Sequence, residues 1–203
     1  MRMGAQIALY PMTDRFVDVI LPAIDVLKHT EGLDVSNDDL STLLLGEVDS
    51  VFAATRDMFA AAASHGAHVV LNALFSRGCP GDSYCDPRLG PPQPQAVDQA
   101  PPEALSRSQE ASGVRIAAQY SLYPLGTDSY MDQIYRVIGA VRESGSFTGS
   151  KNFCTRLDGD ADAVFDDLYR SFVAADAAHS VVHATISAHS PSTQRHNTTG
   201  GLQ

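Results

Sequence analysis

The side chains of this sequence that could take part in chemistry are amides, hydroxyls and a histidine, set within short apolar segments. Asn72 lies in the segment 69–75 (VVLNALF), and His183 and Thr185 lie in 181–187 (VVHATIS). Side chains of a strand point to alternate faces, so these three are expected opposite their apolar neighbours. Such groups donate and accept hydrogen bonds. They would orient a small polar ligand, and a polar interface between two sheets accounts for them equally well.

Tyrosine and serine extend the same pattern in two other segments. In 5–12 (AQIALYPM), Tyr10 belongs to the less apolar set of an alternating pattern, and in 118–125 (AQYSLYPL) Ser121 and Tyr123 do so. A tyrosine ring offers a stacking surface, and small residues beside it leave room for a ligand. We therefore place these residues on the same sheet face.

A further strand in each half adds hydroxyls and a thiol. Alternation with Leu40 and Leu44 places Thr42 and Thr155 on the apolar side of the sheet, unless a bulge re-aims them. We interpret Cys154 as a small buried residue rather than a nucleophile, although basic residues stand nearby in the sequence. The candidate ligand-binding residues are thus Tyr10, Ser41, Thr42, Asn72, Ser121, Tyr123, Cys154, Thr155, His183 and Thr185.

Motifs of known catalytic or metal chemistry are missing from the sequence. It contains no phosphate loop, no dinucleotide-binding glycine motif, no H-E-x-x-H and no nucleophile elbow. Cys79 and Cys85 do not have zinc or redox spacing, and we interpret them as part of a turn. His179 and His183 share a strand face without a recognised zinc pattern. We therefore predict a binding protein rather than an enzyme, with no metal and no cofactor.

Four carboxylates stand where helices are expected to begin: Glu47, Asp49, Asp160 and Asp162. They could attract a cation. A carboxylate at a helix start also caps free amides and matches the helix dipole, and we favour that interpretation.

The elements that must position these residues occur twice. The segment 5–12 returns as 118–125, and 46–52 (GEVDSVF) returns as 159–165 (GDADAVF). Both matches have an offset of 113, as from Tyr10 to Tyr123 (123 − 10). At this offset the copies differ at two pairs of the last strand, Val70/His183 and Asn72/Thr185, which predicts two related sites with unequal affinity.

Periodicity and turn residues predict the order strand, helix, strand, strand, helix, strand in each copy. That order predicts an α+β fold of tandem duplicated ferredoxin-like (βαββαβ) repeats, with antiparallel sheets and the helices on one face. The other face must be covered by the second copy or by a second chain. Pro22 predicts a kink or a break near Leu21 in the first helix.

The predicted domains are a first repeat at 1–77, a proline-rich linker at 78–115, a second repeat at 116–189 and a disordered tail at 190–203. The formal net charge of −10 argues against a nucleic-acid partner. The sequence has no apolar run long enough to cross a bilayer and no signal peptide, and three cysteines make no disulfide framework. We expect a cytoplasmic protein that does not insert into membranes.

Three features together resemble the YkoF family of thiamin- and hydroxymethylpyrimidine-binding proteins. They are the tandem copies with LYPLG at 122–126, the run FSRGCPGD at 75–82, and the GDxDxVF start of the helix at 159–165. The resemblance covers residues 5–189. It implies two ferredoxin-like repeats, a homodimer, a ligand site in each repeat and a role in salvage or transport of the thiamin precursor, without catalysis.

Two other functions stay open at this point. One is a regulatory module of the same fold that senses another small metabolite such as an amino acid. The other is a small dimeric ferredoxin-like oxygenase or isomerase. The enzyme would need an acid or base over a cavity, for which His183 is the candidate.

Overall fold

The structure is a computed structural model that describes residues 2–78, 103–108, 110–175, 177 and 179–192. The first copy contains β1 (Arg2–Pro11), α1 (Phe16–Lys28), β2 (Asp34–Asn37), β3 (Thr42–Glu47), α2 (Val48–Ala63) and β4 (Val69–Arg77). The second contains β5 (Arg115–Leu125), α3 (Tyr130–Arg142), β6 (Phe147–Lys151), β7 (Cys154–Asp160), α4 (Ala161–Ala174) and β8 (His179–Ala188). The predicted βαββαβ order is confirmed in both copies.

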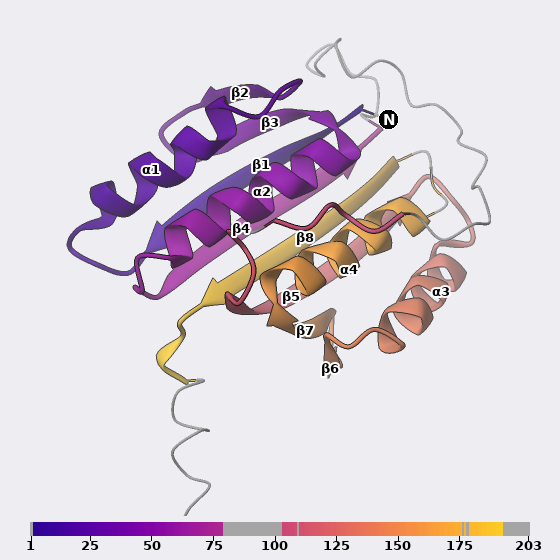
Figure 1. Ribbon diagram of the computed structural model, residues 1–203. Coiled ribbons are helices and arrows are strands. Elements are labelled where there is room, and N and C mark those ends of the chain that lie inside the picture. The colour runs from indigo at the N-terminus through magenta and orange to yellow at the C-terminus, as the bar shows by residue number, and fades with distance from the viewer. Residues whose placement is uncertain (1, 79–102, 109, 176, 178, 193–203) are drawn as a thin grey trace, which may run out of the picture.

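The two copies share one continuous antiparallel sheet, with the strand order β2-β3-β1-β4-β8-β5-β7-β6. β4 and β8 join the copies edge to edge, and all four helices lie on one side of the sheet (Figure 1). The copies therefore do not cover each other's sheets. Among the described residues, the sheet face away from the helices, called the bare face below, runs across both copies without a covering element.

The core lies between the sheet and the helices and is continuous across the join. Phe52 of α2 stacks on Phe75 of β4 at 4.1 Å and also meets Phe172 of α4 at 5.6 Å between ring centroids. All three side chains are fully buried. Burying a phenylalanine side chain contributes about 2–3 kcal/mol, so this aromatic group makes the join part of the core.

The last strand shows that the offset between the copies changes along the chain. Tyr10 pairs with Val70, and Tyr123 pairs with Val181. Val181 is therefore the structural counterpart of Val70, at an offset of 111 (181 − 70). α2 has 16 residues and α4 has 14, which accounts for the difference. The matching of Val70 with His183 is wrong by two residues, but an even shift leaves every side chain on its predicted face.

The corrected register makes Asn72 the counterpart of His183 and Leu74 the counterpart of Thr185. Ala73 pairs with Ala184 where the copies join, and these two are also counterparts at an offset of 111 (184 − 73). An approximate twofold axis therefore passes through this pair, perpendicular to the sheet.

The first helix does not break at Pro22. α1 runs without interruption from Phe16 to Lys28. Pro22 is exposed, so the carbonyl that loses its hydrogen bond lies near solvent and can be hydrated. The prediction of a break is wrong, and the reason is that the proline lies on the outer side of the helix.

Residues 103–108 and 110–113, together called the strap below, lie between α2 and α4 on the outside of the helix layer (Figure 1). Leu105 and Ala111 of the strap are buried against the core. This part of the predicted linker therefore packs more closely than its composition indicates. The cysteines Cys79 and Cys85 and most of the predicted tail lie outside the described residues.

The capping interpretation is confirmed at one of the two helix starts. Asp160 is the N-cap of α4 and accepts a hydrogen bond from the Asp162 backbone amide at 3.0 Å. Glu47 occupies the same place at α2 but makes no side-chain cap. Asp162 has a further role, because it forms an ion pair with Arg56 at 3.1 Å.

Candidate functional site

The bare face carries most of the residues that the sequence singled out. Along β5, Gln119 and Tyr123 are exposed and Ser121 is half-buried, while the residues between them are buried against the helices. β1 repeats this arrangement with Gln6 and Tyr10. The alternation predicted from the sequence is therefore confirmed, and the candidate side chains of the two copies share one surface.

The centre of the bare face is a polar pair that crosses the join. Asn72 of β4 and His183 of β8 are within hydrogen-bond distance, at 3.1 Å from Nδ2 to Nε2 and 3.3 Å from Nε2 to Oδ1. They are also structural counterparts. One copy contributes an amide and the other an imidazole to the same place beside the twofold axis, so the two halves of the face differ chemically there.

The sheet register places the remaining residues in two rows that the twofold axis relates. One row crosses the sheet as Leu43, Gln6, Leu74, His183 and Ser121. The other crosses it as Arg156, Gln119, Thr185, Asn72 and Ala8. Each row combines an amide at its outer part with a polar group near the join, and each row draws on both copies. Below, the polar bare-face residues of each copy are called its half-site.

Hydrogen bonds hold several of these side chains in place. Gln6 donates from Nε2 to Ser41 Oγ at 2.9 Å, and Ser121 donates from Oγ to the Phe153 carbonyl at 2.8 Å. Cys154 is half-buried and lies with its Sγ 3.4 Å from the Lys151 carbonyl. A fixed amide in the first half-site is suited to reading a ligand edge rather than adapting to it.

Thr42 and Thr155 lie on the helix side of the sheet and are buried. Thr42 donates to Asn37 Oδ1 at 2.7 Å. Thr155 forms a hydrogen bond with the hydroxyl of Tyr120. The pKa of Tyr120 lies above its usual value, chiefly because the side chain is buried. The structure thus separates these threonines from the bare face, in agreement with the alternation and without a re-aiming bulge.

Sequence reasoning did not include Arg156 and Asp158, which stand on the bare face of β7. Arg156 forms a two-point ion pair with Asp158, at 2.8 Å from Nε and 2.7 Å from Nη2. Burial raises the pKa of Asp158, but hydrogen bonds from Arg156 and Thr148 outweigh it and hold that pKa below its usual value. The corresponding positions in the first copy, Leu43 and Leu45, are apolar. The 113-residue offset was the signal that could have revealed this contrast.

His183 of β8 pairs with an amide instead of a carboxylate, and burial lowers the pKa of His179 on the same strand. Within the part of the chain that the structure describes, no group of three or more His, Cys, Asp or Glu side chains could hold a metal ion. In the same part, no helix is both long and apolar enough to span a membrane.

The fold is that of a tandem ferredoxin-like protein, and the described part of its bare face carries polar groups that differ between the two copies. Residues 2–82 and 115–193 each match the YKOF-related family, so the chain belongs to this family.

The chain is similar to two known proteins. It is 35% identical over 193 residues to the Bacillus subtilis (strain 168) protein named "Putative HMP/thiamine-binding protein YkoF", covering 93% of this chain and 91% of that protein. It is also similar to the crystal structure of the hypothetical protein MJ1052 from Methanocaldococcus jannascii, with a TM-score of 0.38 and 18% identity, over 43% of this chain and 92% of that one.

Proposed function

We propose that this protein binds thiamin or its hydroxymethylpyrimidine part on the bare face, without catalysis, in salvage or transport of the thiamin precursor. The observation that carries the proposal is the similarity over 93% of the chain to a protein named for binding these compounds. The face chemistry supports it independently, because amides and hydroxyls can pair with the donors and acceptors of an aminopyrimidine.

The aromatic residues suit the other part of thiamin. Tyr10 and Tyr123 stand at equivalent ends of β1 and β5, and about half of each side chain is exposed. A tyrosine ring face attracts a cation such as the thiazolium. The proposed ligand contacts in the two half-sites are Tyr10, Ser41 and Asn72, and Ser121, Tyr123, Cys154, His183 and Thr185.

A homodimer is part of this proposal. An antiparallel sheet can leave one face in water, but the bare face also exposes Leu43, Leu74 and both tyrosines. A second copy packed against this face would bury them and enclose the half-sites. We place this homodimer in the cytoplasm.

Calorimetric titration of the full-length chain with thiamin, hydroxymethylpyrimidine and a set of amino acids tests the ligand class. We expect heat from at least one of the first two compounds. Heat from an amino acid alone would favour a regulatory module instead. Heat from none of them at millimolar concentration would refute the proposed function.

A further inference from the structure

A cavity of about 410 Å³ opens on the helix layer, on the other side of the sheet from the bare face. Its lining comes from Thr30, from the outer side of α2, from residues 103–106 of the strap and from Tyr169 of α4. This volume lies in the range of small-molecule sites, about 300–1,000 Å³. The half-sites described above do not use it.

The charged side chains among the described lining of the cavity are all acidic. Its described lining includes the carboxylates of Asp49, Asp57 and Glu103 and no lysine or arginine. Arg56 offsets part of the charge of Asp57, with its Nε 2.8 Å from Oδ1, and shares its own charge with Asp162. Excess negative charge therefore comes from Asp49 and Glu103, and it favours a cation.

Tyr169 supplies an aromatic wall to this cavity. Its ring packs edge-on against Phe52, with 5.8 Å between centroids, so the core holds it in place. Burial first, and then the charges of Asp49 and Asp166, raise the pKa of Tyr169 above its usual value. The ring is a neutral phenol at physiological pH, and its electron-rich face can attract a cation.

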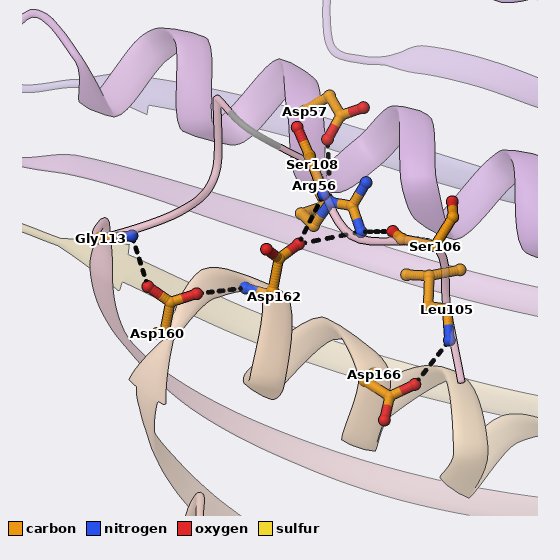
Figure 2. A network of polar contacts seen from close by, with 9 residues as sticks. All are labelled: Arg56, Asp57, Leu105, Ser106, Ser108, Gly113, Asp160, Asp162 and Asp166. Carbon is orange, nitrogen blue, oxygen red and sulfur yellow. Dashed lines mark hydrogen bonds and ion pairs between the residues drawn. The ribbon is translucent and has the colours of Figure 1, made fainter.

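The other half of the molecule shows what an equivalent carboxylate binds. At the offset of 113, Asp49 corresponds to Asp162 and Tyr169 corresponds to Arg56. Asp162 pairs with the Arg56 guanidinium at 3.1 Å, and the arginine side chain is only 2% exposed (Figure 2). Asp162 is thus paired with a guanidinium of the chain itself. Beside its counterpart Asp49, Tyr169 replaces that arginine, and both residues line the cavity.

We propose that this cavity binds a small planar guanidinium compound from solution, with Asp49 and Glu103 as hydrogen-bonded counter-charges and the Tyr169 ring as a stacking surface. The bound group takes the place that Arg56 takes in the other half. The site lies across the sheet from the proposed thiamin site and does not depend on it.

Titration of the full-length chain with methylguanidinium tests this assignment. We expect saturable binding with a dissociation constant on the order of 1 mM, as suits a few contacts at an open site. Asp49→Asn should weaken it at least fivefold. Tyr169→Arg should abolish it, because the new side chain fills the site from within, and should also raise the melting temperature. Asp39→Asn, the same charge change on an exposed turn residue, should leave binding unchanged.

Tetramethylammonium serves as a second probe, because it is a cation that cannot donate hydrogen bonds. Binding of this ion as tight as that of methylguanidinium would overturn the guanidinium assignment. Unchanged methylguanidinium binding in both Asp49→Asn and Tyr169→Arg would overturn the site, as would no saturable binding in the natural chain. Thiamin titration of Tyr169→Arg separates the two proposals, since we expect that variant to bind thiamin normally.

Discussion

At the scale of single residues, Arg56 shows how a buried charge ties distant segments together. Its guanidinium contacts Asp57 on its own helix, Asp162 on α4 and the Ser106 carbonyl in the strap (Figure 2). Asp162 also accepts from the Ser108 amide at 3.2 Å. One side chain of the first copy thus fixes both the second copy and the strap.

Replacing this arginine should therefore be costly. Arg56→Met leaves two carboxylates without their cation and should lower the free energy of unfolding by about 3 kcal/mol. Arg15→Met, which breaks an exposed pair with Asp18, should cost less than about 1 kcal/mol. Urea unfolding of both variants checks this, and equal costs would show that the Arg56 network is not a structural tie.

Asp167 is a second buried residue whose charge matters. It accepts from Ser144 Oγ at 2.6 Å and from Ser146. Burial raises the pKa of Asp167 in the folded protein above its ordinary value of 3.8, so folding favours the protonated form. The stability that it contributes is complete below 3.8 and is lost as the pH rises through the raised pKa.

Asp167→Asn stays neutral and escapes that loss. At each pH the stability of the variant is compared with that of the natural chain. This difference should favour the variant more at pH 7 than at pH 3.5. Thermal unfolding at both pH values measures the difference. The same relative stability at both would contradict the raised pKa.

At the scale of elements, much of the structure follows from the sequence alone. Alternation predicted the faces of β1, β4, β5 and β8 because each strand buries one side against helices. The residue matching failed in β8, since α4 is two residues shorter than α2 and no sequence identity marks the deletion. The contrast of Arg156 with Leu43 was not predicted, because a charged strand residue is typical of a solvent-facing position. A comparison of Arg156 with its counterpart in the first copy is needed to reveal it.

Pro22 provides a test at this scale. It stands inside α1 and is exposed, so it removes a helix hydrogen bond without packing in the core. Pro22→Ala should raise the free energy of unfolding by about 1–3 kcal/mol. Chemical denaturation of Pro22→Ala measures this change. A lower free energy of unfolding in the variant would mean that Pro22 stabilises the helix despite its exposure.

At the scale of the whole molecule, the edge-to-edge join is the feature that local patterns could not predict. Pairing of β4 with β8 brings together residues more than 100 positions apart, such as Asn72 and Thr185. Its consequence is a single wide bare face in place of two sheets that cover each other. The proposed dimer and the proposed ligand sites both depend on that face.

The dimer predicts a definite mass. Sedimentation equilibrium should give twice the chain mass of 21.7 kDa. Leu74→Lys places a charge at the centre of the bare face and should shift the equilibrium to single chains. Tyr135→Lys, on the exposed side of α3, should not. A natural chain that sediments as a monomer at micromolar concentration would refute the dimer.

The most direct test of the account is thiamin titration of a variant whose bare face alone is altered. Gln119→Ala combined with Tyr123→Ala removes an amide and a ring from the second half-site, and Tyr135→Ala removes an exposed ring from the helix layer. We predict that the double variant binds thiamin at least tenfold more weakly at one of two sites, while Tyr135→Ala binds like the natural chain. Unchanged binding in the double variant would contradict the placement of the ligand on the bare face.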